Sequence, residues 1–223
     1  MTRRLYHFCL QPASRMVRVV LQEKGLGFEL RDEAREDGSG GLVTLSSDGE
    51  VPVLVEPDGT AYADAVAVCE YLDEAYPDPP LLPRGLSGRA EVRRLVGCFA
   101  GRLALEAVEP LLEEKLMKRL TRRGVPDSEA IRGALGALKP HLDYIAWLVD
   151  RRRWLAGDDF SLADIAAAAQ LSALDYIGAV PWSAHPGAKD WYARVKSRPS
   201  LRAILLDHVA GAPPSAHYAD LDF

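Results

Sequence analysis

Short apolar runs alternate with amphipathic repeats over about the first 75 residues of the chain. The short runs have the length and β-branched or aromatic content of strands, whereas the repeats place apolar side chains three and four residues apart, as in helices. The expected strands are residues 5–8, 28–30, 53–56 and 60–62, and the expected helices are residues 14–24 and 64–75. Ser14 is expected to cap the first helix, which ends at Gly25. The predicted order is β-α-β-β-α.

Helical repeats dominate the remainder of the chain. Residues 77–83 hold four prolines, which cannot continue a helix, so we expect an interdomain linker there. The expected helices beyond it are residues 87–122 with a kink at Pro110, 128–150, 161–174, 187–197 and 200–208. The predicted organisation is a mixed α/β domain at 1–76, the linker at 77–83, an all-helical domain at 84–209 and an irregular C-terminal tail at 210–223.

Ser161 and Asp164 stand three residues apart at the start of an apolar, alanine-rich run. This is the spacing of a capping box, in which the two residues satisfy each other's backbone N–H groups. We therefore expect both residues to have a structural role at the N-terminus of a buried helix.

Composition excludes several classes of function. The net charge of −5 gives no field suited to broad nucleic-acid binding, and no apolar run approaches the length needed to insert into a membrane. The three cysteines show no metal-ligand spacing, so no metal site is expected. Sparse cysteines and an N-terminus without a secretory signal favour a reducing, cytoplasmic location.

Pro52 follows an extended residue and precedes an apolar run, so it is expected to open a strand. The order of elements, the Val51-Pro52 pair and the proline-rich linker together resemble the glutathione S-transferase superfamily. Three further strings agree with this resemblance: Glu70-Tyr71-Leu72, Trp154-Leu155-Ala156-Gly157 and Ser161-Leu162-Ala163-Asp164. The resemblance implies a thioredoxin-like N-terminal domain, an all-α C-terminal domain, a cis peptide at Val51-Pro52 and a homodimer.

Two longer strings resemble one branch of this superfamily, the FzlA-like branch of alphaproteobacteria, whose members bind filaments of the division GTPase FtsZ. They are His141-Leu142-Asp143-Tyr144-Ile145-Ala146-Trp147-Leu148 and His217-Tyr218-Ala219-Asp220-Leu221-Asp222-Phe223. FtsZ filaments are therefore an expected partner. The branch tends to carry Pro-Trp in the loop at residues 31–41, where this chain has Ala34-Arg35-Glu36, so the mode of contact with FtsZ stays open.

The resemblance also implies where glutathione would bind. Gln11 stands where cysteine- and serine-type relatives place the group that activates the thiol, and it supplies neither a thiol nor a hydroxyl. Ser14 is a weak substitute. Val51 and Pro52 would pair with the tripeptide, and Asp64 would hold its ammonium group. Ala65 replaces a serine that would bond the carboxylate, so we expect no required cofactor and weak glutathione binding at most.

Two features are candidates for contact with a partner. Lys118 and Arg122 belong to a basic cluster on the long helix, which is either a solvated face or a docking patch. Tyr218, Asp220, Asp222 and Phe223 give the tail alternating acidic and hydrophobic side chains, which suit recognition of a short segment. The sequence thus favours a dimeric FtsZ-binding protein with little transferase activity, and leaves open a glutathione transferase acting on small electrophiles.

Overall fold

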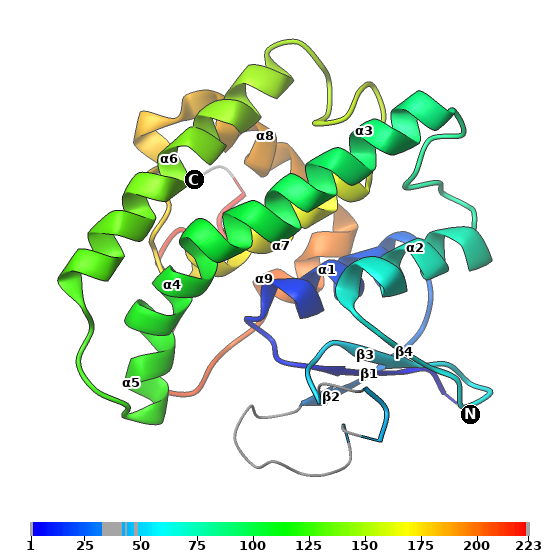
Figure 1. Ribbon diagram of the computed structural model, residues 1–223, viewed down its shortest axis with the longest axis horizontal. Coiled ribbons are helices and arrows are strands. Elements are labelled where there is room, and N and C mark those ends of the chain that lie inside the picture. Colours follow the sequence, from blue (N-terminus) through cyan, green and yellow to red (C-terminus); the bar gives the residue numbers. More distant parts are fainter. Residues whose placement is uncertain (1, 33–41, 43, 47–48, 222–223) are drawn as a thin grey trace. The chain divides into compact units, whose positions relative to one another are not determined.

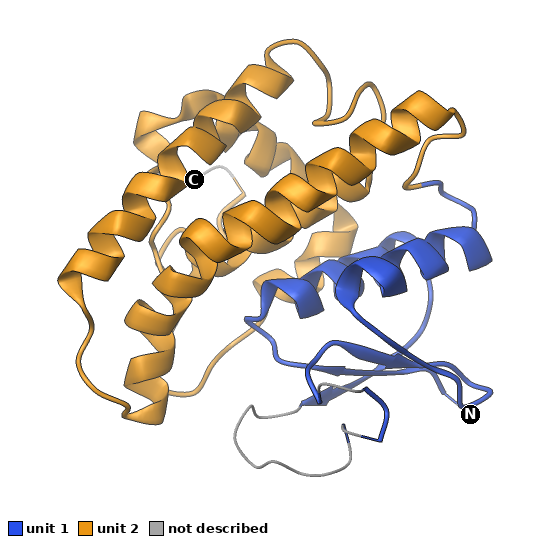
Figure 2. Cartoon of the chain, in the orientation of Figure 1, with its two compact units in different colours: residues 1–80 blue, residues 81–223 orange. Residues whose placement is uncertain are grey.

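The computed structural model describes residues 2–32, 42, 44–46 and 49–221. The chain divides into two compact units, residues 1–80 and 81–223, shown in blue and orange in Figure 2. The division lies inside the proline-rich segment at residues 77–83, where proline restricts the backbone and prevents a helix from continuing.

Unit 1 is built on a four-stranded sheet in the order β2-β1-β3-β4. The strands are β1 (Arg4–His7), β2 (Glu29–Asp32), β3 (Val53–Val55) and β4 (Ala61–Ala63). β1 pairs in parallel with β2 and antiparallel with β3, which in turn pairs antiparallel with β4. The predicted succession of elements along the chain, β-α-β-β-α, is confirmed, and each strand lies within two residues of its predicted bounds.

Two helices complete unit 1 and lie on the same side of the sheet in Figure 1. They are α1 (Pro12–Glu23), which supplies the crossover between the parallel strands, and α2 (Ala65–Ala75). The two helices pack against each other. The apolar stripe predicted for α1 is buried, with Val17, Val20 and Leu21 wholly inaccessible to solvent.

The prediction that Ser14 caps α1 is wrong. The helix begins at Pro12, and Gln11 occupies the N-cap position without a capping side-chain bond. Proline is well suited to the first helical position because its missing N–H would have no partner there in any case. Ser14 is therefore the third residue of the helix, and its side chain is wholly buried.

A continuous helical run crosses unit 2 from residue 86 to residue 121 (Figure 1). It comprises α3 (Leu86–Val96), η1 (Gly97–Val108), α4 (Glu109–Leu112), η2 (Glu113–Met117) and α5 (Lys118–Thr121). The turns of η1 are wider than those of an α-helix, and at its end the Glu109 amide donates to the carbonyl of Ala104. Pro110 follows directly. The wider turn makes room for the proline ring, which would otherwise meet the carbonyl four residues earlier. The helix therefore changes from π-helical to α-helical turns next to Pro110, where a kink was predicted.

The remaining helices of unit 2 follow this run, and all residues of one of them, α7, are buried. They are α6 (Ser128–Val149), α7 (Leu162–Tyr176), η3 (Trp182–Ala184), α8 (Pro186–Lys196), η4 (Pro199–Leu201) and α9 (Arg202–Leu205). α7 packs against η1, α3 and α8, as expected for a helix that is buried on every face. In the part of the chain that the structure describes, no helix has the length and apolar character needed to cross a membrane.

Tyr218, predicted as a contact with a partner, is instead part of the folded core of unit 2. Tyr218 is wholly buried, and its hydroxyl donates to the carbonyl of Ile204 at 2.7 Å. Its ring meets that of Tyr176 edge to face, with the centroids 5.1 Å apart. Tyr218 thus anchors the tail to its own unit and is not exposed for a partner. Asp222 and Phe223 lie outside the described residues.

Replacement of Tyr218 tests this anchoring role. We expect Tyr218→Ala to lower the free energy of unfolding by about 3–5 kcal/mol, because it empties a packed aromatic site. Tyr218→Phe keeps the ring and loses one hydrogen bond, so it should cost only about 1 kcal/mol. Urea denaturation of both variants measures the difference. An alanine variant as stable as the wild type would show that the tail is not part of the folded core.

Candidate functional site

Three segments of unit 1 meet at one end of the sheet. Val53, near the start of β3, pairs with Tyr6 on one side and with Ala63 on the other. The register therefore places the end of β1, the start of β3 and the end of β4 at the same edge. The segments that continue from this edge carry the residues expected around glutathione: Gln11, Ser14, Val51, Pro52, Asp64 and Ala65.

The polar groups at the start of α1 are bonded to one another. The hydroxyl of Ser14 donates to the side-chain oxygen of Gln11 at 2.6 Å, and the Phe8 amide lies 3.4 Å from the same hydroxyl. Because Ser14 is wholly buried and its proton is directed at Gln11, it does not present a hydroxyl to a bound thiol. The position of Ser14 therefore does not support the prediction that it is a catalytic residue.

Arg15 and Arg18 are buried and are not surface charges. The Nε atom of Arg15 donates to the carbonyl of Cys9 at 2.7 Å, which ties α1 to the turn that precedes it. A buried guanidinium needs several acceptors to offset the loss of water, so this bond holds the local backbone in place.

The Val51-Pro52 peptide bond is cis, as the resemblance implied. Val51 is buried in an apolar cluster with Leu42, Val53 and Val55. This cluster fixes the backbone that precedes β3 at the edge where the three segments meet. The position offers a bound peptide main-chain hydrogen bonds rather than a reactive side chain.

Asp64 joins β4 to α2 and has a positive φ of 68°. This conformation is uncommon for a residue other than glycine. One carboxylate oxygen, Oδ1, accepts the amides of Val66 and Ala67, both at 2.9 Å, so Asp64 is the N-cap of α2. Ala65 is buried and presents no hydroxyl at the first position of the helix. The site therefore retains one exposed carboxylate and loses the second polar group.

No group of three or more histidine, cysteine, aspartate or glutamate side chains is placed to hold a metal ion among the residues that the structure describes. Cys69 is wholly buried, and this burial raises the pKa of its thiol well above the ordinary value. A thiol in that state is a poor nucleophile. Cys69 is therefore a residue of the core.

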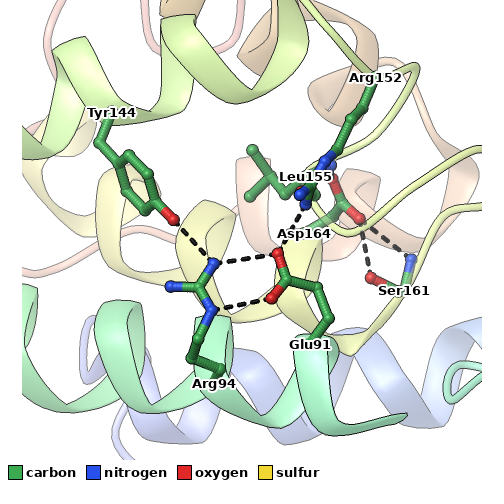
Figure 3. Close-up of polar contacts among 7 residues, drawn as sticks. All are labelled: Glu91, Arg94, Tyr144, Arg152, Leu155, Ser161 and Asp164. Carbon is green, nitrogen blue, oxygen red and sulfur yellow. Dashed lines mark hydrogen bonds and ion pairs between the residues drawn. The ribbon is translucent and has the colours of Figure 1, made fainter. Parts of the chain in front are cut away.

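Asp164 is the centre of a buried polar cluster in unit 2 (Figure 3). Its Oδ2 accepts the amide and the hydroxyl of Ser161, both at 3.1 Å. Its Oδ1 accepts the Leu155 amide and the Trp191 indole N–H, both at 3.0 Å. Burial raises the pKa of Asp164, and these donors oppose the shift. The predicted capping box is confirmed, and the carboxylate also binds two donors from outside the box.

A second polar cluster connects α3 and α6 to the loop that holds Leu155 (Figure 3). Glu91 accepts two hydrogen bonds from Arg94, at 2.8 and 3.0 Å, and one from Arg152 at 2.7 Å. Arg94 also donates to the Tyr144 hydroxyl, and Arg152 to the Leu155 carbonyl. The bonds from Arg94, followed by that from Arg152, lower the pKa of Glu91 to about 2.

The basic cluster on the long helix is partly bonded within unit 2. The ammonium group of Lys118 donates to Glu114 at 2.7 Å, and Arg119 donates to the carbonyl of Gly211 at 2.7 Å. Arg122 ends α5 in a left-handed conformation and is exposed. Of the two cations predicted to meet a partner, Arg122 is the more available, since Lys118 already has a carboxylate partner.

Models of known protein families match a segment in each of the two units. Residues 5–80 match the N-terminal domain of glutathione S-transferase, and residues 127–199 match the C-terminal domain. The chain belongs to the glutathione S-transferase family. It is 45% identical over 224 residues to FtsZ-localized protein A of Caulobacter vibrioides, an alignment that covers 99% of this chain and 98% of that protein.

Two solved structures closely resemble the structure of this chain. A glutathione S-transferase from Rhodospirillum rubrum F11 has a TM-score of 0.97 and 52% sequence identity, covering 99% of this chain and 100% of its own. FzlA from C. crescentus has a TM-score of 0.96 and 45% identity, with both chains covered completely. In sequence and in structure, this family member is FzlA-like.

Sequence reasoning did not find the Glu91 cluster or the extra donors to Asp164. In the sequence, Trp154-Leu155-Ala156-Gly157 indicates a resemblance to the family and no contact with Asp164. In the structure the amide of Trp154 donates to the Gly157 carbonyl at 2.8 Å, which closes a tight loop and directs the Leu155 amide toward Asp164. No spacing rule would have connected Trp191 to Asp164, because 27 residues separate them.

Asp164→Ala should lower the free energy of unfolding by about 2–5 kcal/mol, because it leaves several buried donors without an acceptor. Loss of a helix cap alone would cost about 0.5–2 kcal/mol. Asp164→Asn keeps one acceptor oxygen but turns an NH₂ group toward the donors of Ser161, so an intermediate loss is expected. Chemical denaturation, with the exposed Asp159→Ala as control, measures the series. A loss for Asp164→Ala no larger than that of the control would contradict the assigned role.

Glu91→Gln should reduce stability in a pH-dependent way. Folding lowers the pKa of Glu91 to about 2, so the stabilisation is complete above the unfolded value of about 4.3 and is lost as the pH falls toward 2. The difference in unfolding free energy between wild type and variant should therefore be largest near neutral pH and shrink in acid. The exposed Glu113→Gln is the control. A difference that stays constant from pH 7 to pH 3 would mean that Glu91 is not paired in solution.

Proposed function

We propose that the protein is an FzlA-like cell-division factor that binds FtsZ filaments and has little or no transferase activity. The observation that carries the proposal is the likeness to FtsZ-localized protein A, which extends over nearly the whole of both chains. A likeness confined to the thioredoxin-like unit would favour glutathione binding alone. Here the helical unit and the C-terminal segment are included, and these are the regions that carry the expected partner contacts.

The chemistry at the sheet edge supports the same proposal. Gln11 stands at the position of the activating group, and the Ser14 hydroxyl is directed at Gln11. Ala65 supplies no side-chain donor for a carboxylate. Loss of one such hydrogen bond weakens binding by about ten- to a hundredfold. Glutathione is therefore proposed as a weak ligand at most, held by the backbone before β3 and by Asp64, and not as a required cofactor.

The partner contact is proposed to use the exposed end of the tail and the basic end of the long helix. Asp220 and Leu221 are exposed, directly after the buried anchor Tyr218. Arg122 adds a positive charge whose contribution should fall as salt increases. In this proposal Tyr218 does not contact the partner; it holds the exposed residues that follow it in place. The loop in which Ala34-Arg35-Glu36 replaces the Pro-Trp of the branch lies outside the described residues.

A homodimer in the cytoplasm is part of the proposal. Proteins of this family usually pair through the thioredoxin-like domain and the long helices, and a dimer would present two filament-binding surfaces at once. Two linked contacts bind a filament far more tightly than either contact alone. The cytoplasm is where FtsZ filaments assemble, and the sparse cysteines of the chain suit a reducing compartment.

Co-sedimentation with filaments of FtsZ from the source organism tests the proposal, together with calorimetric titration of glutathione on the same sample. We expect the wild-type protein to pellet with GTP-assembled filaments and to remain in the supernatant without them. Glutathione should bind more weakly than micromolar, and turnover of an aromatic electrophile should be negligible. Micromolar glutathione binding with turnover, and no co-sedimentation, would instead establish a glutathione transferase.

A further inference from the structure

The C-terminal segment completes the end of α7. An α-helix leaves its last carbonyl groups without intrahelical partners, and α7 is buried along its whole length. The amide of Ser215 donates to the carbonyl of Tyr176 at 2.8 Å, and the Ser215 hydroxyl donates to the carbonyl of Asp175 at 2.7 Å. The segment therefore supplies two of the donors that this buried helix end needs.

A charged cluster lies at the same helix end. Asp175 and Lys196 are wholly buried, with the carboxylate Oδ2 of Asp175 3.5 Å from the Lys196 ammonium. Oδ1 accepts the Trp182 indole N–H at 2.7 Å and lies 2.9 Å from Nε2 of His217. Lys196 in turn donates to the His217 carbonyl at 3.1 Å. Both residues of the ion pair thus contact His217 of the C-terminal segment, Asp175 through Oδ1 and Lys196 through its ammonium group.

Ser215, His217 and Asp175 are the residue types of a hydrolytic triad, but their arrangement does not relay a proton. A triad uses both ring nitrogens of the histidine, one toward the serine and one toward the aspartate. Here Nε2 lies 3.5 Å from the serine hydroxyl and 2.9 Å from the carboxylate. The serine hydroxyl instead donates to a backbone carbonyl. The cluster is arranged to hold the segment.

Further bonds fix the segment before it reaches His217. The carbonyl of Ala212 accepts the Tyr176 hydroxyl at 2.7 Å, and the Val209 amide donates to that hydroxyl at 2.9 Å. Arg119 on α5 donates to the carbonyl of Gly211, and the trace after α9 runs toward α5 in Figure 1. The bonds continue to the end of the segment, where the amide of Tyr218 donates to the Ser215 carbonyl at 3.0 Å and the amide of Asp220 donates to the His217 carbonyl at 3.1 Å. The side chains of Asp220 and Leu221 are exposed.

We propose that Asp175, Lys196 and His217 form a latch that positions the end of the chain for its filament contact. The inference rests on the proposed function, since it names the residues that set the geometry of that contact. A buried ion pair adds little net stability because its desolvation is costly, but it specifies one arrangement of the groups that it joins. An end held in one place loses less conformational freedom on binding, so the latch raises affinity without touching the partner.

His217 offers the cleanest test because its side chain is 39% exposed and its loss leaves the buried pair intact. Amide hydrogen exchange at Ser215 and Tyr218 and filament co-sedimentation are measured for His217→Ala, His217→Gln and the exposed control His208→Ala. We expect His217→Ala to speed exchange in the segment by about tenfold and to weaken filament binding by about tenfold, with α7 unchanged. Glutamine donates to Asp175 and should restore both, whereas the control should change neither.

Each alternative result has a definite meaning. Exchange that does not change in His217→Ala overturns the latch. Faster exchange with unchanged filament binding leaves the cluster a purely structural element and overturns its positioning role. A wild-type protein that does not bind filaments overturns the proposed function, and with it the positioning role, while the exchange measurement still shows whether the segment is latched.

Discussion

The carboxylate of Asp164 is the constraint on which the helical unit depends. It lies at the start of a helix that is buried on every side, where no water can satisfy the first amides. Four donors from three separate segments converge on its two oxygens: two from Ser161, one from Leu155 and one from Trp191. Each donor would be unsatisfied without it, so the loop before α7, the helix itself and α8 are fixed by one side chain.

The thioredoxin-like unit shows that a fold can be retained while its site changes. The sheet register still brings the start of α1, the Val51-Pro52 bond and Asp64 to one edge. Ser14 at this edge is directed inward to Gln11, and the position at the start of α2 is an alanine. These features support the proposal of a binding protein with little transferase activity.

The proposed filament contact places function at the end of a segment that the helical unit itself needs. The tail caps α7 through Ser215 and packs Tyr218 into the core, so folding and the presentation of Asp220 and Leu221 depend on the same bonds. A contact surface displayed from a rigid element loses less entropy on binding than a free chain end. In the proposed function, this coupling fixes the position of the residues that meet the filament.

The sequence by itself determined the order of elements, the two-part organisation and the capping box, because these follow from local periodicity, proline content and spacing over a few residues. The family resemblance added the prediction that Gln11 and Ala65 replace polar groups of the glutathione site. Only the tertiary structure decided the positions of Ser14 and Tyr218, which looked like a helix cap and an exposed anchor and are both buried. Likewise, Trp191 donates to Asp164, 27 residues away in the sequence, and Asp175 contacts His217, 42 residues away. Such contacts arise from the packing of whole helices and loops, so patterns of neighbouring residues in the sequence do not predict them.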